Sequence, residues 1–93
     1  MWILTRSEWP LLINLAVTAT IGYQQVAKFD SRVRVIATTW EAEHLLADCE
    51  TGDEARALVR HIAQSLRQGV GFLDLNKVDL EQLTVAAIEP GIL

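Results

Sequence analysis

The sequence predicts an α+β fold: an antiparallel β-meander of about four strands, one amphipathic helix packed on one face, and a C-terminal short strand or helix. Two patterns carry this prediction. Apolar residues recur at every second position from residue 11 to 23, which is the period of a β-strand. Residues 51–68 repeat apolar side chains every three or four positions, as an amphipathic helix does. We expect a single domain, residues 1–93, because a chain of 93 residues has room for one core.

The β-meander is expected to occupy residues 1–50. Residues 2–6 form a short first strand, and Pro10, which has no backbone donor, fits the following turn or the start of the next strand. The alternating segment that begins at Leu11 is too long for one strand, so we expect a break or bulge within residues 14–17. Residues 32–40 and 44–50 are predicted to form a hairpin.

The register of this hairpin follows from matching apolar partners and opposite charges. A three-residue turn at 41–43 pairs Val35 with Cys49 and Arg34 with Glu50. The core is then expected to combine helix and strand residues: Leu58, Val59, Ile62, Leu66, Ile21, Val33, Val35 and Leu45. The opposite face of the sheet is expected to expose three apolar side chains: Ile36, Leu46 and Trp40.

The predicted helix, residues 51–68, has clear signals at both ends. Thr51 and Glu54 have the spacing of a capping box, in which the Thr51 hydroxyl accepts the Glu54 amide. Gly69 follows the last turn, where glycine commonly ends a helix. One apolar stripe runs between these ends: Ala55, Leu58, Val59, Ile62, Ala63 and Leu66.

The C-terminal extension, residues 69–93, has a weaker pattern. Residues 72–75 fit a short strand, and residues 79–88 fit a helix that ends before Pro90. Residues 73–78 also echo residues 13–17 in sequence, although the matched segment is short. The extension is expected either to cover the exposed sheet face or to leave that face to a second copy.

Composition limits the location and the partners of the protein. The net charge of −4 disfavours nucleic acid as the principal partner. A single cysteine excludes an internal disulfide, and we expect a cytoplasmic protein. Residues 9–27 carry no charge but are too polar for a bilayer helix, so no membrane association is expected, with export through this segment as the alternative.

A family resemblance begins in the segment Leu-Ile-Asn-Leu-Ala-Val-Thr-Ala-Thr-Ile at residues 12–21 and continues to the start of the helix. Over about residues 1–68 the chain resembles small uncharacterised bacterial proteins that close a β-meander with one helix. Some of these are likened to half of a pleckstrin-homology-type barrel. The resemblance implies a fold, and it implies no catalytic residue and no ligand.

Few residues could carry chemistry. Cys49, His44 and His61 form the one conceivable nucleophile set, but no motif surrounds them, and a buried thiol is ordinary packing. The two histidines with Asp48 show no recognised metal-binding spacing. We therefore expect no catalytic residue, no cofactor and no metal.

Surface patterns favour a non-enzymatic protein-interaction module that uses an apolar sheet face or edge, and a homodimer is one form of it. The interaction residues expected on the sheet face are Ile36, Leu46 and Trp40. Three arginines gather within about 60° of the helical wheel: Arg56, Arg60 and Arg67. The alternative function is an adaptor that binds a small ligand or nucleic acid through this arginine face, and an enzyme comes last.

Overall fold

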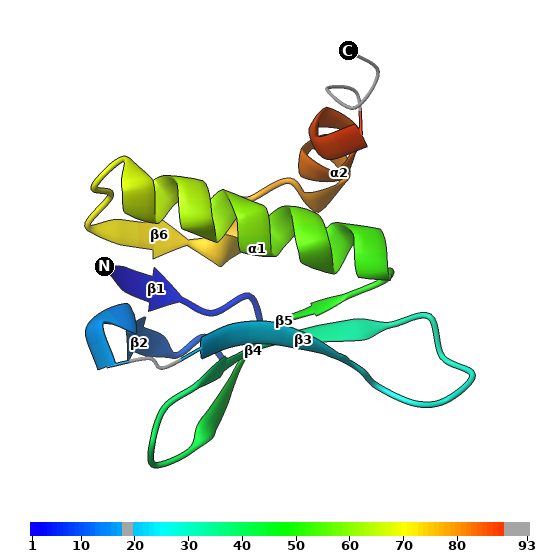
Figure 1. Cartoon of the computed structure of the whole chain (residues 1–93), viewed down its shortest axis with the longest axis horizontal. Coiled ribbons are helices and arrows are strands. Elements are labelled where there is room, and N and C mark those ends of the chain that lie inside the picture. Colours follow the sequence, from blue (N-terminus) through cyan, green and yellow to red (C-terminus); the bar gives the residue numbers. More distant parts are fainter. Residues whose placement is uncertain (18–19, 89–93) are drawn as a thin grey trace.

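The computed structural model describes residues 1–17 and 20–88 (Figure 1). In chain order, the elements in these residues are β1 (Trp2–Leu4), β2 (Leu12–Asn14), η1 (Leu15–Val17), β3 (Thr20–Gln25), β4 (Val33–Thr38), β5 (Glu43–Cys49), α1 (Gly52–Arg67), β6 (Phe72–Asp74), η2 (Leu75–Lys77) and α2 (Leu80–Ile88). The α+β class is confirmed. The break expected within residues 14–17 is the 3₁₀ turn η1, and the extension forms both a strand and a helix.

The strands form two three-stranded sheets. One has the order β3-β4-β5 and is antiparallel throughout. The other has the order β2-β1-β6, in which β1 pairs antiparallel with β2 and parallel with β6. Arg6 joins them, because its amide donates to the Leu46 carbonyl at 2.7 Å and it forms an isolated bridge with Ala47. The predicted topology, an antiparallel meander within residues 1–50, is therefore incomplete, because the C-terminal strand β6 pairs parallel with the first strand β1.

Helix α1 lies across β3, β4 and β5, and α2 packs against α1 (Figure 1). The Thr51 hydroxyl accepts the Glu54 amide at 3.2 Å, as the sequence predicts, but the Glu54 carboxylate accepts the Glu50 amide at 2.9 Å. Gly69 has φ +74°, a left-handed conformation that glycine adopts without steric cost. The cap and the terminal glycine thus fix both ends of α1.

The predicted hairpin register is wrong. Val33, not Val35, pairs with Cys49, and the pairing shifts between Val35 and Ile36. This shift leaves Leu46 as the extra residue of a β-bulge, because Ala47 pairs with Val35 and Leu45 pairs with Ile36. A one-residue change of register exchanges the two faces of a strand.

The exchange of faces at the β5 bulge explains two corrections to the predicted core. Leu46 is fully buried in the core, whereas Leu45, a predicted core residue, is 40% exposed. Leu46 therefore does not belong to an exposed sheet face. The largest fully buried side chains come from both sheets, α1 and η2: Ile3, Leu46, Leu58, Ile62 and Leu75.

The described part of the extension does not cover the outer face of the β3-β4-β5 sheet. β6 pairs with β1, and α2 packs on α1. The Arg6 guanidinium donates to the carbonyls of Leu75 at 3.0 Å and Val78 at 2.8 Å, which ties η2 to the end of β1. The predicted helix end before Pro90 lies outside the described residues.

Candidate functional site

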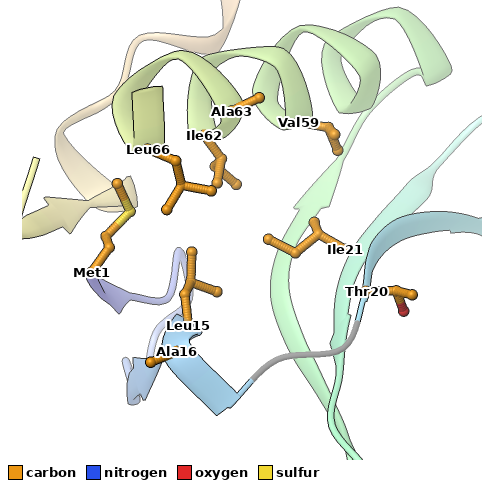
Figure 2. Close-up of a pocket in the computed structure, with 9 residues that line it drawn as sticks. All are labelled: Met1, Leu15, Ala16, Thr20, Ile21, Val59, Ile62, Ala63 and Leu66. Atoms are coloured by element: carbon orange, nitrogen blue, oxygen red, sulfur yellow. The ribbon is translucent and has the colours of Figure 1, made fainter. Parts of the chain in front are cut away.

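An apolar pocket of about 380 Å³ lies between α1, η1 and the start of β3 (Figure 2). Figure 2 shows the Ile21 side chain projecting from β3 toward side chains of α1, with Met1 and Leu15 closing the far end. The lining is almost entirely apolar: Met1, Leu15, Ala16, Thr20, Ile21, Val59, Ile62, Ala63 and Leu66. This volume is at the lower end of the range that binds small ligands or single large side chains.

The pocket exists because the apolar stripe of α1 is wider than its contact with the sheet. Leu58 and Ile62 are buried against the core, but Val59 is only half-buried and Leu66 is 47% exposed. The predicted core position of Leu66 is therefore wrong. Its side chain is exposed at the pocket.

Strand β3 forms the wall of this pocket and is also an edge strand of its sheet. The Val26 amide donates to the Arg32 carbonyl at 3.1 Å, and the register continues without a shift from this pair through β3. Hydrogen-bonded and non-hydrogen-bonded residue pairs alternate along an antiparallel ladder. Counting from Val26, the backbone of Gln24 is hydrogen-bonded to β4 and the backbone of Tyr23 is not. By the same alternation, the backbone groups of Ile21 and Tyr23 point away from β4.

These outward groups make no backbone hydrogen bond within residues 1–17 and 20–88. The segment Thr20–Gln25 carries no charge, no proline and no bulge, which are the devices that usually protect an edge. The opposite edge strand, β5, differs, because it contains the bulge at Leu46 and bonds to Arg6. β3 is thus open to pairing with another extended backbone.

Three arginines lie beside the pocket along α1. Arg60 and Arg67 are three residues before and four residues after Ala63, and Arg56 is three residues before Val59. Residues with these spacings are neighbours on a helix surface, so the arginines flank the pocket-lining face. The pKa of Arg56 is raised, mainly by its hydrogen bond to Asp53 and to a small extent by nearby Tyr23.

Arg56 forms an ion pair with Asp53, three residues earlier on α1. Arg60 and Arg67 form no ion pair with any acidic side chain in the part of the chain that the structure describes. The α1 side of the pocket therefore carries positive charge, although the chain has a net charge of −4.

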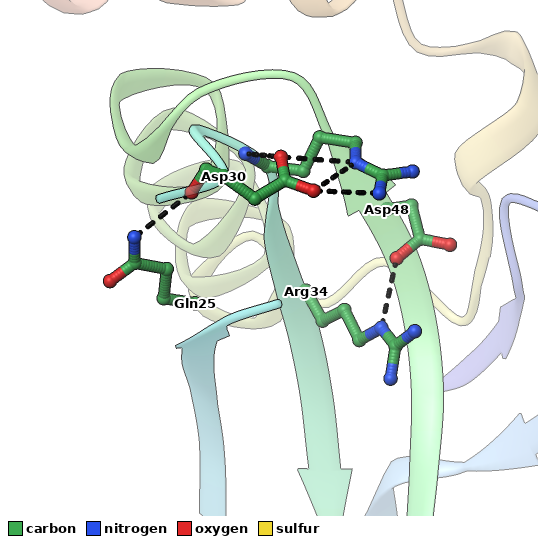
Figure 3. A network of polar contacts seen from close by, with 5 residues as sticks. Gln25, Asp30, Arg34 and Asp48 are labelled. Carbon is green, nitrogen blue, oxygen red and sulfur yellow. Dashed lines mark hydrogen bonds and ion pairs between the residues drawn. The ribbon is translucent and has the colours of Figure 1, made fainter. Parts of the chain in front are cut away.

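The turn after β3 is held by its own polar contacts (Figure 3). The Gln25 carboxamide donates to the Asp30 carbonyl at 2.9 Å, and the Arg32 guanidinium pairs with the Asp30 carboxylate at 2.7 Å. The hydrogen bonds from Arg32 lower the pKa of Asp30. Arg34 pairs with Asp48 at 3.3 Å and not with Glu50, as the observed register requires. The contacts of Gln25, Asp30 and Arg32 thus hold the turn that joins β3 to β4.

The predicted apolar sheet face is not a continuous patch. Trp40 is 85% exposed in the β4–β5 turn, Ile36 is half-buried, and Leu46 is inside. A different sheet face is more apolar. On the outer face of β2-β1-β6, Trp2 lies beside Phe72, and both are about half-exposed, as is Leu12.

Cys49 is buried in the core, and burial raises the pKa of its thiol to about 11. Nearby Glu54 raises it further, while Arg6 opposes the shift. At pH 7 about one thiol in 10⁴ is then ionised, which is the reverse of an activated nucleophile. His44 lies on β5 and His61 on α1, and no group of three metal-ligating side chains gathers anywhere in residues 1–17 and 20–88.

No described helix is long and apolar enough to span a bilayer. Comparisons of the chain with protein-family models, with curated proteins and with solved structures found no match.

Proposed function

We propose that this protein is a non-enzymatic interaction module that binds an extended segment of a protein partner along the edge of β3. The segment adds as a fourth strand to the β3-β4-β5 sheet, and one of its side chains enters the apolar pocket under α1. In this mode of recognition, backbone hydrogen bonds supply affinity and a pocket for alternate side chains supplies specificity.

The observation that carries this proposal is the coincidence of an open edge and a pocket. Ile21 has outward backbone groups and also lines the pocket, so a strand paired with it would place a side chain beside that pocket. An unprotected edge is a hazard for aggregation, which favours a binding role as the reason for leaving it open.

The three arginines of α1 favour binding of a partner in the groove between β3 and α1, and they do not favour a separate nucleic-acid site. Arg60 and Arg67 flank one small pocket, whereas a nucleic-acid surface extends over many phosphates and makes a domain basic. An anionic partner segment would be attracted to this side of the molecule at low ionic strength.

Hydrogen exchange at single amides tests the proposal. Peptides selected from a displayed library of random nine-residue segments are added to isotopically labelled protein. We expect the Ile21 and Tyr23 amides to exchange fast in the free protein and slowly in the complex. The Gly22 and Gln24 amides, which bond to β4, should be protected in both states. The proposal is overturned if the library yields no binder. It is also overturned if the bound peptides leave hydrogen exchange at the Ile21 and Tyr23 amides unchanged.

A proline variant provides a second test. Tyr23→Pro removes an outward amide, so it should weaken peptide binding while the sheet retains its bonds to β4. Phe72→Ser is the matched control, because it removes an exposed aromatic side chain from the other sheet and should leave binding unchanged. Equal binding by Tyr23→Pro and wild type would contradict edge pairing.

A further inference from the structure

We infer that the groove between β3 and α1 selects an antiparallel segment with the pattern acidic residue, any residue, large aliphatic residue, read from N- to C-terminus. This inference rests on the proposed function and specifies the chemistry of the partner. It assigns the aliphatic side chain to the pocket beside Ile21 and the acidic side chain to Arg56 and Arg60.

Strand geometry sets the spacing of the two side chains. Ile21 and Tyr23 lie on the same face of β3, toward α1, because they pair with the buried residues Ala37 and Val35. The partner residues opposite Ile21 and Tyr23 therefore also face α1 and are separated by one residue. In an antiparallel segment the residue opposite Tyr23 comes first. Antiparallel addition continues the arrangement of this sheet and is slightly more stable per residue than parallel pairing.

The pocket determines the aliphatic position. Its walls are carbon surfaces of Leu15, Ile21 and Leu66, with neighbouring apolar residues of α1. A charged or amide side chain would lose its water contacts there without finding a described side chain to bond to, except the Thr20 hydroxyl. Leucine or methionine fills such a space without this cost.

The arginines determine the acidic position. α1 runs antiparallel to β3, so the pocket residues Ile62 and Leu66 lie toward the start of β3 (Figures 1 and 2). Arg56 comes earlier on α1 and lies near enough to Tyr23 for that side chain to contribute to the raised pKa of Arg56. Arg60 is one turn from Arg56 on the same flank and makes no ion pair with the described residues. A carboxylate opposite Tyr23 thus meets positive charge, whereas a lysine there would be repelled.

The experiment titrates four blocked peptides into the full-length protein and measures binding by isothermal titration calorimetry. The probe is acetyl-Ser-Thr-Glu-Thr-Leu-Thr-Ser-amide. A permuted peptide exchanges its Glu and Leu, a third replaces Leu by Ala, and a fourth replaces Glu by Lys. We expect binding about tenfold weaker for the Ala peptide and about fivefold weaker for the Lys peptide, and weaker than either for the permuted peptide, which loses both contacts.

A charge exchange isolates the role of the arginine. The Arg60→Glu protein should bind the Lys peptide more tightly than the Glu probe, which reverses the order seen with wild type. Lys77→Glu is the matched control, because Lys77 is an exposed cation of η2 that does not line the pocket, and its replacement should leave the order unchanged.

The outcomes separate the two proposals. Binding that depends on Leu and protects the Ile21 amide, but ignores the Glu position and Arg60→Glu, overturns this inference and leaves the proposed function standing. Equal binding of the probe and the permuted peptide also overturns the inference. If none of the four peptides binds and the displayed library yields no binder, both proposals fail.

Discussion

Asn14 and Asp74 are the last residues of the two strands that flank β1, with Asn14 opposite Trp2 and Asp74 opposite Leu4. The Asn14 side-chain oxygen accepts the Ala16 amide at 3.0 Å, and the Asp74 carboxylate accepts the Asn76 amide at 2.9 Å. Each residue ends a three-residue strand that continues into a 3₁₀ turn, β2 into η1 and β6 into η2. The two strands flank β1 in opposite directions. The weak sequence echo between these segments therefore corresponds to a repeated local structure.

The first prediction concerns the bulge in β5. Leu46→Ala should cost about 2–5 kcal/mol of unfolding free energy, because it leaves a cavity in the core. Leu45→Ala should cost less than about 1 kcal/mol, since Leu45 is 40% exposed. Urea unfolding of both variants measures the difference. If Leu45→Ala loses more unfolding free energy than Leu46→Ala, the bulge is contradicted and the uninterrupted register predicted from the sequence is favoured.

The second prediction compares two glycines. A Cβ at Gly22 would meet no atom within 4 Å and the backbone is not left-handed, so Gly22→Ala should stabilise the protein by about 0.5–1 kcal/mol. Gly69→Ala should destabilise it by about 1 kcal/mol, because φ is +74°. Thermal melts should shift in opposite directions, and a shift in the same direction would contradict the described backbone.

The third prediction follows from the buried thiol. Burial raises the pKa of Cys49 from 9.0 to about 11, so the unfolded chain loses this proton at lower pH than the folded protein. The contribution of Cys49 to stability is then present below pH 9 and should be lost, by roughly 2 kcal/mol, as the pH rises toward 11. Urea unfolding at pH 8 and pH 10.5 measures this loss.

Cys49→Ala is the control, because it retains the alkaline titration of every other group and should lose less stability between the two pH values. Iodoacetamide should also label wild-type Cys49 slowly at pH 7.5 and rapidly in urea. Fast labelling of the folded protein would show that the thiol is accessible.

The fourth prediction tests the exposed tryptophan. Trp40 is 85% exposed in a turn, so Trp40→Glu should melt within about 1 °C of wild type and should bind the groove peptides equally well. Light scattering of both proteins adds a further readout. If wild type self-associates and Trp40→Glu does not, the interface lies at the β4–β5 turn.

Patterns of local spacing predicted most of the fold. The period of two in the strands, the Thr51 cap and the terminal Gly69 depend on near neighbours, and the structure contains all of them. The bulge at Leu46 could not be predicted, because matching of apolar partners favours an uninterrupted ladder. Its cause is the fit of Leu46 into a core that residues from distant segments complete.

The groove was missed for a related reason. Its residues come from four separate segments, including Met1, Leu15, Ile21 and Leu66, and an apolar residue at a pocket has the same sequence pattern as one in a core. Two signals were nevertheless present. The segment 20–25 lacks the charge that edge strands usually carry, and the arginines lie next to the apolar stripe of the helix.

The bonds of Arg6 to Leu75 and Val78 connect residues 69 and 72 positions apart. β1 likewise gains its second neighbour, β6, only when residues 72–74 are present. During synthesis on the ribosome, one edge of β1 stays unpaired until more than 60 further residues have been made. Cooperative folding of the two sheets therefore requires β6, and a chain interrupted before residue 72 lacks the strand that completes the sheet.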